Sequence, residues 1–209
     1  NRGYAKYELE DYYGAISDYT KAIEINPNLV LAYYNRGLAK GELEDYYGAI
    51  SDYTKAIELD PNYVLAYSNR GNSKNNLKDN YGAISDYTKA IEINPDFALA
   101  YYNRGVSKAE LKDHSEAIAD YNKVIELDPN YVDAYYNRGN AKRRSEDNYG
   151  AISDYTKAIE LKPNYAKAYG GRGISKELIG DMSGACSDWK KAANLGDTDA
   201  AKWVANQCS

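Results

Sequence analysis

The stretch that decides the fold is Ala32–Pro61, AYYNRGLAKGELEDYYGAISDYTKAIELDP. Variants of it follow one another along the chain at a spacing of 34 residues, and residues 1–34 differ from residues 35–68 at six positions. The tripeptide NRG begins at residues 1, 35, 69, 103 and 137, and GRG begins at residue 171. A repeat of this length predicts supersecondary units that stack on their neighbours as a solenoid.

The composition is that of a folded protein with an acidic balance. Apolar residues make up 44% and charged residues 27% of the 209 residues, and the net charge is -5. An acidic chain is a poor match for a phosphate backbone, so we expect no nucleic-acid partner. No apolar run approaches the length of a membrane span, so we expect no membrane partner.

Each unit is predicted to contain two helices, and in all but the last unit a proline ends the second one. In the second unit we predict a first helix at 30–43 and a second at 46–59. Asp45, between them, is typical of a helix N-cap, and Pro61 follows the end of the second helix. Glycine recurs in the first turn of the second helix, as at Gly48, where helix propensity disfavours it.

The motif Tyr33-x2-Arg36-Gly37-x2-Lys40, with Ala49-x3-Tyr53 and Pro61, resembles the tetratricopeptide repeat (TPR) pattern W-x2-L-G-x2-Y…A-x3-F…P. We therefore identify the chain as similar to the TPR family, with NRG-type repeats. The resemblance implies an all-α, right-handed superhelical solenoid of antiparallel helix pairs. Arg and Lys replace the Leu and Tyr of the pattern in all six units.

The whole chain, residues 1–209, is expected to be a single TPR array of about six repeats with a C-terminal capping helix. The predicted units are a partial one at 1–29, then 30–63, 64–97, 98–131, 132–165 and 166–198, with the capping helix at 199–207. Gly196 is expected as a helix C-cap. No equivalent cap is visible at the N-terminal end, where an apolar stripe would be exposed.

The resemblance implies that the first helix of each repeat lines a concave groove that binds a peptide or a partner protein. One asparagine per repeat would hold the backbone of the bound peptide, and apolar side chains beside it would form pockets. The alternative is that these asparagines only bond between neighbouring first helices. The predicted groove residues are Leu31, Tyr34, Asn35, Leu38, Leu65, Asn69, Asn72, Leu99, Tyr102, Asn103, Val106, Tyr136, Asn137 and Asn140.

A second ladder pairs an arginine of each first helix with an aspartate of each second helix, as Arg36 with Asp52. A partly buried arginine needs a carboxylate, so the ladder is interpreted as structural ion pairs, with anion binding as the alternative. Arg104→Leu should then be tolerated or stabilising, whereas an Asp120 change should destabilise by leaving a buried charge.

No catalytic or cofactor-binding motif accompanies the repeat, so we expect a non-enzyme without cofactor or metal. His114 occupies a turn position and is interpreted as a surface residue. Cys186 is interpreted as a small core residue, because two cysteines are too few for a disulfide framework. The cytoplasm is slightly favoured as the compartment.

The function expected is a protein-protein interaction module. Two other hypotheses stay open: a self-assembling scaffold, in which arrays stack through the uncapped N-terminal end or form dimers, and the docking part of a longer protein.

Overall fold

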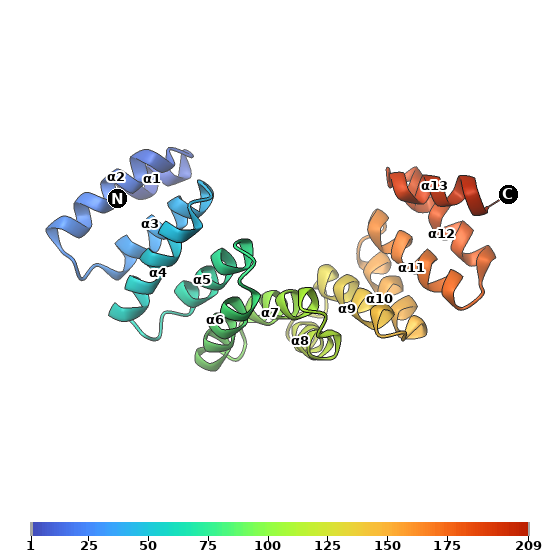
Figure 1. Cartoon of the computed structure of the whole chain (residues 1–209). Helices are drawn as coiled ribbons and strands as arrows, with labels where there is room; N and C mark the ends of the chain where they lie inside the picture. Colours follow the sequence, from blue (N-terminus) through green and yellow to red (C-terminus); the bar gives the residue numbers. More distant parts are fainter. Residues whose placement is uncertain (1, 209) are drawn as a thin grey trace. The chain divides into compact units, whose positions relative to one another are not determined.

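The computed structural model describes residues 2–208, which form thirteen α-helices and contain no β-strand (Figure 1). The helices are α1 (Arg2–Glu8), α2 (Tyr12–Ile25), α3 (Val30–Glu42), α4 (Tyr46–Leu59), α5 (Val64–Asn76), α6 (Asn80–Ile93), α7 (Ala98–Glu110), α8 (His114–Leu127), α9 (Val132–Arg144), α10 (Asn148–Leu161), α11 (Ala166–Leu178), α12 (Met182–Asn194) and α13 (Thr198–Gln207). The predicted two-helix unit is confirmed to within one residue.

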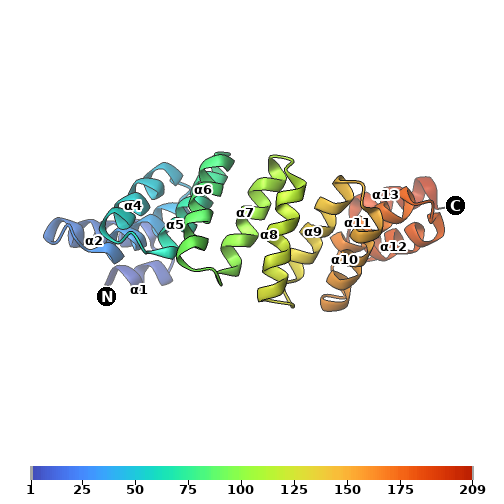
Figure 2. The same cartoon turned by 90° about the horizontal axis from the view of Figure 1, so that it is seen from below.

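The chain divides into two compact units, residues 1–107 and 108–209, and the division lies within α7. In the first unit α3 packs on α4 and α5 on α6 (Figure 1), while α4 also packs on α5 of the next pair (Figure 2). The second unit repeats this arrangement from α9 to α13. First helices therefore contact one another at one side of each unit, as α3 contacts α5 and α9 contacts α11. A single array over the whole chain stays a prediction.

Close packing of each pair depends on the glycine of the NRG tripeptide. A Cβ atom at Gly37 would lie 2.7 Å from Cε1 of Tyr53, a buried residue of α4. Glycine, which has no Cβ atom, leaves room for the tyrosine ring against the first helix. The glycine of the TPR-like motif is thus a packing residue.

The predicted aspartate caps are present, and they explain the glycine in the first turn of the second helix. The carboxylate of Asp45 accepts a hydrogen bond from the amide of Gly48 at 2.9 Å. A Cβ atom at Gly48 would lie 2.1 Å from Asp45 Oδ2, so glycine leaves room for the cap. In α8 the residue equivalent to Gly48 is Glu116. Its backbone amide lies 3.4 Å from Asp113 Oδ1, so this capping hydrogen bond is longer than that of Gly48.

The turn inside each pair contains a residue in left-handed conformation. After α3, the amide of Glu44 bonds the carbonyl of Gly41 and the amide of Asp45 bonds that of Lys40, which together form a Schellman motif. Glu44 has a φ of 59°, a conformation that favours glycine. The sequence gives glycine at this place only once, at Gly180 with a φ of 85°, and the other pairs carry glutamate or lysine. The predicted C-cap Gly196 has a φ of 95°.

The last helix covers the end of the second unit, as predicted. Ala200 is buried, and the ring of Trp203 lies 5.5 Å from that of Trp189, between centroids. Lys202 and Gln207 are exposed.

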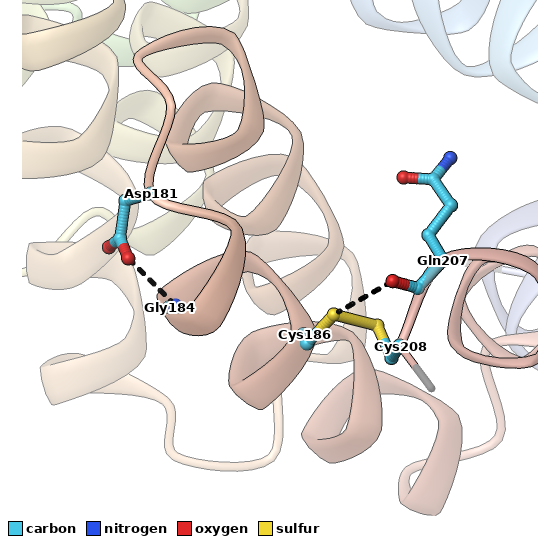
Figure 3. The surroundings of a disulfide bond; sticks show 5 residues. All are labelled: Asp181, Gly184, Cys186, Gln207 and Cys208. Carbon is cyan, nitrogen blue, oxygen red and sulfur yellow. Dashed lines mark hydrogen bonds between the residues drawn. A yellow bond between two sulfur atoms is a disulfide. The ribbon is translucent and has the colours of Figure 1, made fainter.

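A disulfide joins Cys186 of α12 to Cys208, just after α13 (Figure 3). The interpretation of Cys186 as a small core residue was therefore wrong. The two cysteines are 22 residues apart in sequence, and only the return of α13 onto α12 brings them together. Disulfides are rare in cytosolic proteins, so this bond favours an oxidising compartment over the expected cytoplasm.

Candidate functional site: the first-helix faces

Every residue predicted to line the groove lies on a first helix and is exposed or half-buried. They are Leu31, Tyr34, Asn35 and Leu38 on α3, Leu65, Asn69 and Asn72 on α5, Leu99, Tyr102, Asn103 and Val106 on α7, and Tyr136, Asn137 and Asn140 on α9. Those on α3, α5 and the first ten residues of α7 belong to the first unit, and those on α9 belong to the second. Their role in binding stays a prediction.

Three leucines at equivalent positions of the first unit expose much of their side chains. Leu31 is 64% exposed, Leu65 44% and Leu99 42%. They are the most exposed aliphatic side chains among the predicted groove residues.

The asparagine ladder forms hydrogen bonds between neighbouring first helices. Asn69 Nδ2 donates to the hydroxyl of Tyr34 on α3 at 2.9 Å. Asn103 Nδ2, on α7, donates to Asn72 Oδ1 on α5 at 3.0 Å, and Asn72 Nδ2 donates to Asn69 Oδ1 at 3.3 Å. The alternative interpretation, bonds between first helices, is thus observed for Asn69 and Asn103. An amide has more than one donor and acceptor, so each can also contact a ligand.

A hydrogen bond from a buried tyrosine, Tyr87, fixes the orientation of the Asn72 side chain. The hydroxyl of Tyr87, which is 1% exposed, donates to Asn72 Oδ1 at 2.8 Å. In the second unit the hydroxyl of Tyr155 donates to Asn140 Oδ1 at the same distance. Burial raises the pKa of Tyr155 to about 12 and that of Tyr87 further, so both hydroxyls keep the proton that they donate.

A cavity of about 450 Å³ opens beside this amide network in the first unit. It is lined by Asn72, Asn75, Asn76, Tyr87, Leu99, Asn103 and Val106. Sequence reasoning missed Asn75 and Asn76. The sequence did contain a signal, because two amides occur here where the other repeats have different residues. The corresponding residues are Gly41 and Glu42 on α3, Ala109 and Glu110 on α7, and Arg143 and Arg144 on α9.

The arginine ladder is a set of structural ion pairs. Arg36 Nε lies 2.9 Å from Asp52 Oδ2 and its Nη2 lies 2.6 Å from Asp52 Oδ1, a bidentate pair in which the aspartate is 3% exposed. The third nitrogen, Nη1, donates to Thr20 Oγ1 at 3.0 Å. All three nitrogens have partners, which argues against the alternative of anion binding.

The ladder also accounts for the lysine that departs from the TPR pattern. Lys40 Nζ lies 2.8 Å from Asp52 Oδ2, so two cations share one buried carboxylate. Since Thr20 belongs to α2, the second helix of the previous pair, Arg36 joins two consecutive pairs as well as the two helices of its own. The arginine and the lysine that depart from the TPR pattern therefore both belong to one ion-pair cluster around the buried aspartate.

No cluster of metal-ligating side chains exists among residues 2–208, and none of the helices there is long and apolar enough to cross a bilayer. His114 is the first residue of α8 and is half-buried, so it begins the helix and does not lie in the turn before it.

Comparison with known protein families gives matches along most of the chain. One model, described as TPR repeat, matches residues 3–43 and 107–145. Two models described as tetratricopeptide repeat match residues 30–63, 64–97 and 132–165, and residues 86–119. The chain belongs to the tetratricopeptide repeat family. No curated protein matches it at a significant level.

Solved structures of TPR proteins resemble the chain in fold. A crystal structure of MamA is 29% identical, with a TM-score of 0.74 over 79% of this chain and 96% of MamA. YrrB, described as a TPR protein with an unusual peptide-binding site, is 23% identical, with a TM-score of 0.77 over 90% of this chain and 97% of YrrB. The C-terminal part of a TPR repeat-containing protein from Cytophaga hutchinsonii is 19% identical, with a TM-score of 0.81 over 98% of this chain and 81% of that one. The all-α TPR fold class is confirmed, and the TPR neighbours support a protein-interaction module.

Proposed function

We propose that the chain binds an extended segment of a partner protein along the faces of its first helices. The observation that supports this most is the surface formed by α3, α5 and the start of α7. It combines three exposed leucines with half-buried amides whose orientations are fixed by hydrogen bonds. Oriented amides can pair with a peptide backbone whatever its side chains, and the leucines can cover apolar side chains.

The strength of such binding would come from several repeats together. One groove hydrogen bond contributes about 1 kcal/mol net, and ordering the partner costs free energy. A segment must therefore contact two or more first helices to bind in the micromolar range. The fold needs no catalytic group for this, and TPR proteins are typically non-catalytic.

The test replaces two of the exposed leucines, Leu65 and Leu99. Random peptides displayed on phage are selected on the chain, and binding of the selected peptides is measured for Leu65→Ser/Leu99→Ser. We expect binding to fall at least about tenfold, since two apolar contacts are lost. The matched control is Tyr47→Ser/Tyr81→Ser, which removes two side chains that are 77% and 76% exposed on second helices. Equal effects of the two double variants would contradict the proposal.

A second copy of the chain is the alternative partner, as in a self-assembling scaffold. Sedimentation over a range of concentrations separates the two hypotheses. A monomer at all concentrations would exclude self-assembly, whereas association abolished by the two leucine changes would show that copies bind through this surface.

A further inference from the structure

Helix α5 differs from the other first helices where the cavity of the first unit opens. Its last turns carry Asn72, Asn75 and Asn76, whereas the helices before and after it carry apolar, small or charged residues at the corresponding places. The cavity, which we call the α5–α7 pocket, is lined by these three residues with Asn103, Tyr87, Leu99 and Val106. All of them lie in the first unit.

The lining of the α5–α7 pocket carries no formal charge. Four of its seven residues are amides, one is a tyrosine and two are aliphatic. A charged group that entered would lose hydration without meeting an opposite charge, which is unfavourable. The pocket therefore favours a neutral ligand group that has both polar and apolar parts.

Hydrogen bonds inside the lining determine which polar atoms are left for a ligand. Asn75 Nδ2 donates to Ser107 Oγ at 2.7 Å and to Asn80 Oδ1 at 3.2 Å, which uses both of its protons and leaves its Oδ1. Asn103 uses one proton for Asn72, which leaves its second proton and its Oδ1. The side chain of Asn76 is exposed, so its amide group is accessible to a ligand. The lining of the pocket thus offers both acceptors and donors.

We propose that the α5–α7 pocket binds the carboxamide side chain of a glutamine or asparagine in the partner segment. A carboxamide has two donors and an acceptor in one plane, which complements the oxygens of Asn75 and Asn103 and the amide of Asn76. Its methylene groups would lie on Leu99 and Val106. The inference rests on the proposed function, because it specifies one side chain of the segment bound there.

The groups that line the pocket also disfavour two competing ligands, a glutamate side chain and a sugar. Glutamate has the shape of glutamine but no donor, so its carboxylate would face the two acceptor oxygens with a negative charge. A sugar is neutral and rich in donors, but the ring of Tyr87 is 1% exposed and offers no face for a sugar ring to stack on.

The experiment uses peptides selected on the full chain from a random phage library. We expect the wild-type selection to converge on glutamine or asparagine at one position. Replacing that glutamine by glutamate in a synthetic peptide should weaken binding about tenfold or more in a fluorescence anisotropy titration.

A variant that reverses the preference gives the sharper test. Asn76→Arg places a cation at an exposed residue of the pocket lining, and the chain already accommodates an arginine at the equivalent position, Arg144 on α9. We expect this variant to bind the glutamate peptide more tightly than the glutamine peptide. The control is Ser85→Arg, which adds the same charge at an exposed residue of α6 and should keep the wild-type preference.

Two failures are distinguishable. If no peptide is selected, the proposed function fails, and the inference fails with it. If peptides are selected without a carboxamide, or glutamate replaces glutamine without loss, the pocket inference is overturned and the proposed function stands. Binding of neutral oligosaccharides in place of peptides on a glycan array would also overturn it.

Discussion

The cluster of Arg70, Lys74 and Asp86 gives the prediction that tests the ion-pair ladder most directly. Asp86 is 3% exposed and accepts from Arg70 Nε at 3.0 Å and Nη2 at 2.7 Å, and from Lys74 Nζ at 2.8 Å. Arg70 and Lys74 are 16% and 22% exposed in their side chains. Asp86→Ala therefore leaves two half-buried cations facing each other without a carboxylate.

We expect Asp86→Ala to lower the free energy of unfolding by about 3–5 kcal/mol, the cost of leaving buried charge unpaired. Arg70→Leu should cost only about 1 kcal/mol, because Lys74 still neutralises Asp86 and leucine is the residue of the TPR pattern at this place. The small cost replaces the tolerated or stabilising effect expected from the sequence for Arg104→Leu, since the hydrogen bond of Arg70 to Thr54 Oγ1 is lost. The combined change Arg70→Leu/Lys74→Tyr/Asp86→Ala should be close to neutral, since it removes all three charges together.

The assay is urea unfolding followed by circular dichroism at 222 nm, with thermal melts as a second measure. A loss of 3–5 kcal/mol lowers the melting temperature of a chain of this size by roughly 10 °C. Glu58→Ala is the control, because its pair with Lys55, at 2.9 Å, joins side chains that are 59% and 45% exposed and contributes little. Equal costs for Asp86→Ala and Arg70→Leu would refute the reasoning.

Three further predictions concern the turns, the capping helix and the tyrosines. Glu44→Gly should raise the free energy of unfolding by about 1 kcal/mol in urea melts, since Glu44 adopts a left-handed conformation that glycine adopts freely. Reduction of the disulfide, or Cys186→Ser, should lower the stability of α12 and α13 by about 3 kcal/mol, because the disulfide closes a loop between cysteines 22 residues apart. Faster hydrogen exchange in these two helices is the measurement. Burial holds the pKa of Tyr155 at about 12, against about 10 when unfolded, so its contribution to stability is complete below pH 10 and is lost between pH 10 and 12. Absorbance at 295 nm should show that Tyr155 ionises only well above pH 10, and ionisation of all tyrosines near pH 10 in the folded chain would contradict the burial argument.

Features that depend on neighbouring residues could be predicted from the sequence. The helix pairs, the cap of Asp45 and the C-cap of Gly196 are set by contacts within a turn or two of helix, so their residue types appear at fixed short spacings. The pairing of Arg36 with Asp52 was also predicted, because a partly buried cation needs a carboxylate and the repeat supplies one per unit. The left-handed Glu44 was not, since its residue type gives no signal for that conformation.

Only the tertiary structure decided the contacts between consecutive helix pairs. Thr20 meets Arg36, Asn75 meets Ser107, and Cys186 meets Cys208 only because helices distant in sequence are stacked side by side. The sequence by itself determined the TPR repeat, the helices, their caps and the residues at each first-helix face. Stacking then decided which amides bond one another and which remain open in the α5–α7 pocket, because hydrogen-bond partners of a side chain are chosen by distance in space and not by position in the repeat.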